Sequence, residues 1–183
     1  GEHYGSSDAH DWTTNSGRYY LLEVSVPDGY LIEQSVIPVE FTYENQFIAW
    51  QIVDCLHSDK QTTVEIDKRA FTSDSDDTFA LTGATLTVTD WNGNVVDSWE
   101  SSDTAHVICG LHLSHDFAGN RDTSKVYTLA ETCPADGYTT ARSIQFRLEQ
   151  ATDDNAYLQE TAVWVLHESE DTAYQSGSII SPT

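Results

Sequence analysis

Basic residues are scarce in this chain of 183 residues. It has 8 Lys and Arg against 30 Asp and Glu, which gives a formal net charge of −22. Nucleic acids and anionic membranes both bind basic protein surfaces, so the composition argues against either as a partner. No apolar run approaches the roughly 20 residues of a membrane-spanning helix. No leader peptide or sorting signal is recognisable, so we expect any secretion or anchoring signal to lie outside these residues.

Cysteine is also scarce. Cys55, Cys109 and Cys133 show no C-x-x-C spacing, which excludes a framework of several disulfides and leaves at least one thiol unpaired within the chain. Cys109 and Cys133 are expected at opposite ends of neighbouring strands, about 20 Å apart and too far for a disulfide. The stability of the fold must therefore come from its core or from another kind of covalent cross-link.

Helical periodicity, enzyme motifs and metal-binding spacings are lacking too. No segment longer than ten residues shows a helical pattern. There is no nucleophile elbow or Gly-rich phosphate loop, so we expect no cofactor and no enzyme that acts on external substrates. His112, His115 and Asp116 share one loop, and the acidic run 72–78 lacks the Gly and Glu of an EF-hand. Both are expected to be solvated rather than to bind metal.

Alternating segments rich in β-branched residues dominate what is present. Residues 64–68 (VEIDK) and 84–89 (ATLTVT) alternate apolar and polar side chains, and Asn92-Gly93 marks a hairpin before 95–99. Further strands are expected at residues 106–108, 126–131, 143–148 and 162–166. Short strands separated by frequent turns predict an antiparallel β-sandwich.

A short box occurs twice in the chain. The two copies are YYLLE at 19–23 with PDGY at 27–30, and YTLAE at 127–131 with PADGY at 134–138. An apolar-x-Phe segment follows each copy, VEF at 39–41 and IQF at 144–146. A repeat of about 108 residues predicts tandem domains of one fold.

The two repeats are unequal in length. Residues 59–175 hold the roughly seven strands of a complete β-sandwich domain, whereas residues 1–58 correspond to the C-terminal half of one. Half a sandwich leaves apolar faces uncovered, so a longer parent protein or another chain would supply the missing strands. Residues 176–183 (SGSIISPT) are expected to be a linker to a further module.

Strand alternation places three charged side chains on apolar faces: Lys68, Glu131 and Glu23. Burial shifts a Lys pKa towards the neutral, nucleophilic amine and a Glu pKa towards the neutral acid. A neutral Glu can donate a hydrogen bond to an Asp or Asn side-chain carbonyl and activate it for attack. The product would be an isopeptide bond. A buried ion pair is the alternative.

The second repeat resembles a known family. The matching segments are 64–68, 81–88 (LTGATLTV), 93–96 (GNVV), 127–131 and 134–138. They resemble the collagen-adhesin B-type repeats, also called SpaA-like or prealbumin-like domains, of Gram-positive surface proteins and pilins. The resemblance covers nearly all of 62–168 and, in its C-terminal half only, 17–54. It implies immunoglobulin-like sandwiches, the first one incomplete, at the bacterial cell surface or cell wall, and often a self-formed isopeptide bond.

The resemblance also implies roles for single residues. Lys68 would be the nucleophile and Glu131 the proton-shuttling acid, with an acceptor near the end of the last strand. Aligning the Trp residues of the two repeats puts Glu168 at that position in the second repeat and Asp54 in the first. Glu168 is one methylene longer than the family's Asp or Asn. The first repeat has the acid Glu23 and the acceptor Asp54 but no Lys strand.

These features predict a structural stalk module of a secreted or wall-anchored surface protein. Its partners would be neighbouring domains of the same parent protein. At most, it would carry out a single self-cross-linking event. The alternative is an adhesin that binds a host protein or glycan through loops such as 111–125.

Overall fold

The structure, a computed structural model, describes residues 17–41, 52–56, 58–71, 77–114, 122–153, 157–166, 171–174 and 178–182. All the regular elements in these ranges are β-strands, as the alternating sequence predicts. No helix that could cross a membrane occurs among the described residues.

Most strands of the second repeat form a six-stranded sheet. Its strands, in spatial order, are β13 (Asp171–Tyr174), β12 (Tyr157–Leu166), β11 (Ile144–Thr152), β10 (Tyr127–Cys133), β7 (Thr85–Thr89) and β8 (Val95–Glu100). All neighbours in it are antiparallel. The predicted hairpin joins β7 to β8, and Gly93 in its turn has a φ of 82°, which favours glycine.

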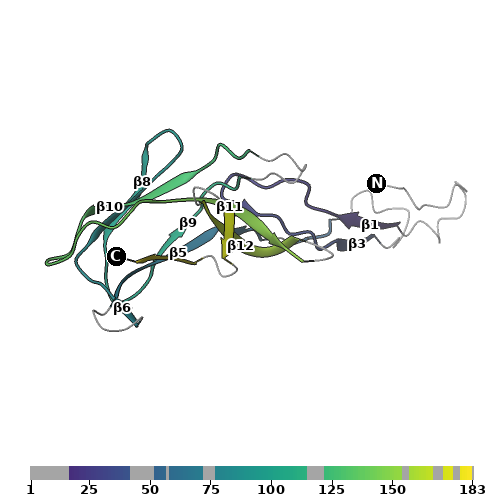
Figure 1. Ribbon diagram of the computed structural model, residues 1–183. Helices are drawn as coiled ribbons and strands as arrows, with labels where there is room; N and C mark the ends of the chain where they lie inside the picture. Colours follow the sequence, from purple (N-terminus) through teal and green to yellow (C-terminus); the bar gives the residue numbers. More distant parts are fainter. Residues whose placement is uncertain are drawn as a thin grey trace, which may run out of the picture.

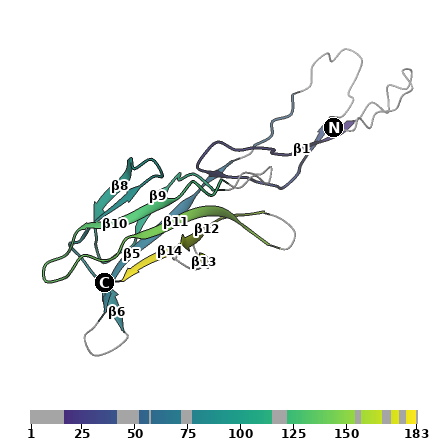
Figure 2. The ribbon, with the colours of Figure 1, turned by 45° about the horizontal axis from the view of Figure 1, so that its top comes forward.

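The second sheet is built around one long strand. β5 (Thr63–Phe71) pairs with β6 (Thr78–Ala80), β9 (His106–Cys109) and β14 (Ser178–Pro182). The two sheets lie one over the other as separate layers (Figures 1 and 2). The fold is therefore an all-β sandwich, as predicted.

The core lies between the two sheets. β5 contributes Val64 and Ile66, and the opposite sheet contributes its alternate side chains, with none of these residues more than 2% exposed. The opposing set is Leu86, Val88, Tyr127, Leu129, Phe146, Leu148 and Val163. Burying one such large side chain stabilises the fold by about 1.5–3 kcal/mol relative to leaving it in water, so this layer holds the two sheets together.

The sandwich does not end where the sequence predicted. Residues 162–166 were expected to be the last strand and 176–183 a linker, yet β13 and β14 follow β12. β14 runs parallel to β5, with Ser181 in register with Lys68. Ser and Pro make this segment resemble a linker, but Pro182 is tolerated at the end of a strand on the sheet edge.

The first repeat forms one short strand pair of its own and one with a strand of the second repeat. β1 (Gly17–Leu21) pairs with β3 (Ile37–Phe41), while β2 (Tyr30–Leu31) pairs with β4 (Lys60–Gln61). The β1–β3 pair projects from one end of the sandwich (Figure 1). The side chains of Tyr20, Leu22 and Val24 are at least half exposed, so these three apolar residues have little cover among the described residues.

The register of β1 and β3 identifies the counterparts in the second repeat. Tyr19 pairs with Val39 as Tyr127 pairs with Phe146. In the first repeat, the segment equivalent to IQF at 144–146 is therefore IPV at 37–39. It begins two residues before the VEF segment that the sequence suggested. The VEF and IQF segments look alike because both end in Phe. The pairing register of the strands, however, decides which residues of the two repeats are equivalent.

Candidate functional site

A buried Lys and a buried Glu face each other across the sandwich. Lys68 is the third inward position of β5 after Val64 and Ile66, and Glu131 is the third inward position of β10. Lys68 is 2% exposed and Glu131 is 7% exposed. Period-two alternation predicted both inward placements.

The charged pair lies at one end of the main core. Beyond Lys68 along β5 comes Ala70, which packs in a small cluster with Leu81, Ala84 and Ala135. Along β5, Lys68 therefore lies between the residues of the main core and this small cluster.

The two charged atoms form a close but incomplete contact. Lys68 Nζ lies 3.6 Å from Glu131 Oε1, and neither atom has a hydrogen-bond partner among the described residues. Burial lowers the pKa of the Lys68 amine, and the Glu131 carboxylate opposes that shift. The amine is therefore easier to deprotonate than an exposed one, as a nucleophile requires.

The other oxygen of Glu131 has a structural task. Glu131 Oε2 accepts a hydrogen bond from the amide of Ala141, ten residues further along the chain. In the first repeat Glu23 Oε2 accepts from the amide of Glu33, also ten residues on, at 2.8 Å. The repeated Glu thus closes the loop after its strand in both copies. The sequence showed the spacing but not this contact.

The described strand beside Lys68 carries no side-chain acceptor of the expected kind. Of the strands that pair with β5, β14 is the one in register with Lys68, and its five residues, SIISP, include no Asp or Asn. Ser181, in register with Lys68, has no side-chain carbonyl for an amine to attack. Glu168, the predicted acceptor, lies outside the described residues.

The predicted first-repeat set is only partly described. Asp54 is exposed, in a segment without regular strand structure, while Glu23 is half-buried and holds the loop at Glu33. The roles of Glu23 as an acid and Asp54 as an acceptor stay predictions.

A second site, which sequence reasoning missed, joins the two repeats. Residues 27–32, here called the junction turn, pack on the second repeat with Leu31 and Ile32 1% and 2% exposed. Gly29 O accepts from the Thr62 amide at 2.9 Å. The only sequence signal was the apolar Leu31-Ile32 pair after the turn.

Three residues of the second repeat receive the junction turn: Thr62, Gly110 and Gln150, here called the socket. Gln150 holds Ile32 on both sides, accepting from its amide at 3.0 Å and donating to its carbonyl at 2.9 Å. A Cβ built on Gly29 would lie 2.4 Å from Gly110 O. The two backbones are therefore closer than any residue but glycine allows.

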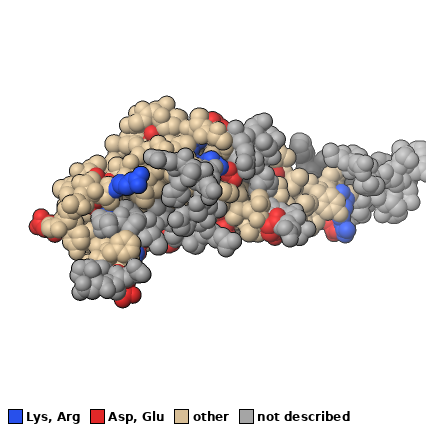
Figure 3. Space-filling model, viewed as in Figure 1, with Lys and Arg blue, Asp and Glu red and all other residues tan. Residues whose placement is uncertain are grey.

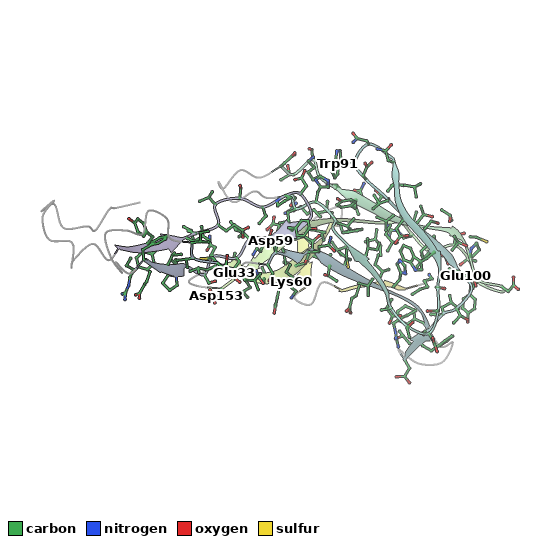
Figure 4. All side chains as sticks on the ribbon, turned by 180° about the vertical axis from the view of Figure 1, so that it is seen from behind. Glu33, Asp59, Lys60, Trp91, Glu100 and Asp153 are labelled. Atoms are coloured by element: carbon green, nitrogen blue, oxygen red, sulfur yellow. The ribbon has the colours of Figure 1, made fainter. Side chains whose placement is uncertain are left out.

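Polar and aromatic contacts border this junction. His112 Nδ1 lies 3.3 Å from Asp28 Oδ2, and the His112 ring packs edge-on against Trp91 at 5.4 Å. Lys125 Nζ lies 4.0 Å from the centre of the Trp91 ring. His115 and Asp116 lie outside the described residues. Figure 4 shows Glu33, Asp59 and Lys60 close together where the first repeat meets the sandwich.

Aromatic side chains and thiols lie in different environments. Trp91 and Trp99 pack against the main core. Cys109 and Cys133 are free and exposed, and they lie on strands of different sheets rather than on neighbouring strands.

Comparison with known proteins yields structural similarity only. No family model and no curated protein matches the chain. The pilus adhesin SpaC of Lactobacillus rhamnosus GG, in its open conformation, is similar over 92% of this chain and 24% of its own, with 16% identity and a TM-score of 0.41. The TIE protein of Bacillus anthracis is similar over 93% of this chain and 42% of its own, with 13% identity and a TM-score of 0.41. This chain spans less than half of either protein.

Proposed function

We propose that the chain is a structural stalk module of a bacterial surface or pilus-like protein that works outside the cell. The observation that carries this proposal is the junction between the repeats. Leu31 and Ile32 are buried in it, and hydrogen bonds to Thr62 and Gln150 fix its backbone. A joint of this kind transmits force and orientation between modules, which a loose linker does not.

The charge of the surface also supports a stalk function. In the view of Figure 3 the described acidic side chains are scattered singly, with a few basic ones between them. With a net charge of −22, neighbouring copies repel one another, which favours a solvated spacer.

The Lys68–Glu131 pair supplies two of the three groups that an isopeptide bond needs. Because β14 offers no Asp or Asn beside Lys68, we expect the pair to remain ionic. Intact-mass measurement of the full chain tests this, since the bond would remove one water molecule. If water is lost, fragmentation of the linked peptide will show whether Glu168 is the acceptor.

A binding screen separates the stalk from the adhesin function. The full chain is tested against matrix proteins, mucin and immunoglobulins, and we expect no binding. Specific binding that disappears when residues 115–121 are replaced by Gly and Ser would overturn the stalk proposal in favour of an adhesin.

A further inference from the structure

The second repeat carries the same turn as the docked one. Gly29 and Gly137 have φ values of 83° and 85°. Tyr30 donates its amide to Pro27 O at 3.2 Å, and Tyr138 donates its amide to Ala135 O at 3.0 Å. Together with the matched Glu contacts to the following loop, these values show one backbone conformation in both copies.

The two turns differ in their surroundings. The first fills the socket, and a Cβ on Gly29 would collide with Gly110 O at 2.4 Å. The second is open, because a Cβ on Gly137 would meet no atom of the described residues within 4 Å. Residues 136–140 are all exposed. The same structural element is thus occupied in one repeat and free in the other.

The free turn lies at the opposite end of the sandwich from the junction. It follows β10, whose last residue, Cys133, is in register with Thr85, and Thr85 pairs in turn with Glu100. Figure 4 shows Glu100 at the far end from Glu33 and Lys60. The loop between β10 and β11 and the C-terminal end of β14 lie at this same end in Figures 1 and 2.

We propose that residues 135–140, here called the second turn, form the docking surface for a further module of this fold. That module would present the same socket: an amide like that of Thr62 for the Gly137 carbonyl, a glycine like Gly110, and an amide side chain like Gln150. The inference rests on the proposed stalk function and names its partner. It extends the observed junction into a head-to-tail series, which is a heterologous contact.

The chemistry of the second turn also sets the strength of this contact. The socket holds Gly29 and Ile32 through backbone atoms, so the same hydrogen bonds are open to Gly137 and Thr140. Thr139 and Thr140 replace Leu31 and Ile32, so less apolar surface is buried. The second joint is weaker than the first but keeps its geometry.

The test empties the socket in the full chain and asks whether the second turn of another molecule fills it. The variant carries Leu31→Asp and Ile32→Asp, and near-ultraviolet circular dichroism checks that its sandwich core is native. Sedimentation velocity should show a wild-type monomer and concentration-dependent oligomers of the variant. If the double substitution disturbs the core, Gly29→Ala displaces the junction turn instead, with the same expected association.

Two further variants test whether the second turn makes the contact between molecules. Adding Gly137→Val should return the protein to a monomer. Adding Gly93→Val, at a glycine of similar φ in equally open surroundings, should leave the association intact. A monomer at all concentrations with an emptied socket, or oligomers that survive Gly137→Val, would overturn the proposal. Either result leaves the stalk function to be decided by the binding screen.

Discussion

Replacing Gly29 by Ala isolates the energy of the inter-repeat junction, because the chain contains a matched control. Gly29 and Gly137 occupy equivalent turns with φ values of 83° and 85°. Alanine in this left-handed region costs about 1–2 kcal/mol at either position. Any difference between the Gly29→Ala and Gly137→Ala variants therefore reports what surrounds the turn rather than the turn itself.

The structure sets the size of that difference. The new Cβ at position 29 would lie 2.4 Å from Gly110 O, a backbone atom that cannot rotate away. Opening the junction breaks the hydrogen bond from Thr62 and the two with Gln150, each worth about 0.5–1.5 kcal/mol. It also exposes part of Leu31 and Ile32, each worth about 1.5–3 kcal/mol when fully exposed. We expect the junction to lose at least about 3 kcal/mol from these two sources together.

Amide hydrogen exchange measures this loss directly at protein concentrations where the variants are monomeric, since association would fill the socket again. The Thr62 amide donates to Gly29 O, so its protection reports whether the junction is closed. About 3 kcal/mol corresponds to roughly a 100-fold fall in protection in Gly29→Ala, while Gly137→Ala should leave this amide unchanged. Thr62 protection within about threefold of wild type in Gly29→Ala would refute the reasoning, because the close contact would then carry little energy.

The remaining predictions concern buried polar groups. Lys68→Met should destabilise the fold by about 3–5 kcal/mol in urea unfolding because it leaves Glu131 buried and unpaired, and adding Glu131→Gln should recover part of the loss. Because burial lowers the folded-state pKa of Lys68, the unfolded chain binds more protons between that pKa and 10.5, the ordinary value. Wild-type stability should therefore rise with pH through this window relative to Lys68→Met, and a parallel pH profile of the two proteins would contradict the assignment. Gln150→Glu should cost about 2 kcal/mol or more, since a carboxylate cannot donate to the carbonyls that the amide now binds, whereas Gln145→Glu on the exposed side of β11 should change stability by less than about 0.5 kcal/mol. Burial raises the pKa of Tyr127 to about 12, so a spectrophotometric titration should show one tyrosine that ionises well after the exposed ones and disappears in Tyr127→Phe.

Much of the candidate site could be predicted because strand alternation is a local rule. Successive side chains of a strand point to opposite faces, so the apolar Val64 and Ile66 were enough to place Lys68 inside. The same rule placed Glu131 on the inward face of its strand, together with Tyr127 and Leu129. The equal spacing of the two boxes predicted one fold for both repeats, and Gly29 and Gly137 adopt the same turn conformation.

The partners of these residues could not be predicted in the same way. The Ile179-Ile180 pair is too short to signal a strand, and β14 exists because it pairs with the edge of β5, more than a hundred residues earlier in the chain. That pairing puts Ser181 in register with Lys68, whereas Glu168, the acceptor that the sequence suggests, lies outside the described residues. Which strands become neighbours depends on which strand edges meet when the chain folds. The alternation of apolar and polar residues within one strand does not contain that information.

The sequence by itself determined the all-β class, the repeat and the inward faces of its strands, because each follows from neighbouring residues and the two-residue period of a strand. Only the tertiary structure decided that the junction turn fills a socket on the second repeat while its copy at Gly137 stays open. The two turns have the same local conformation, so the difference comes from the residues that surround them, Thr62, Gly110 and Gln150. Those residues come together only when distant strands pack, and they make one turn a joint and leave the other a free surface.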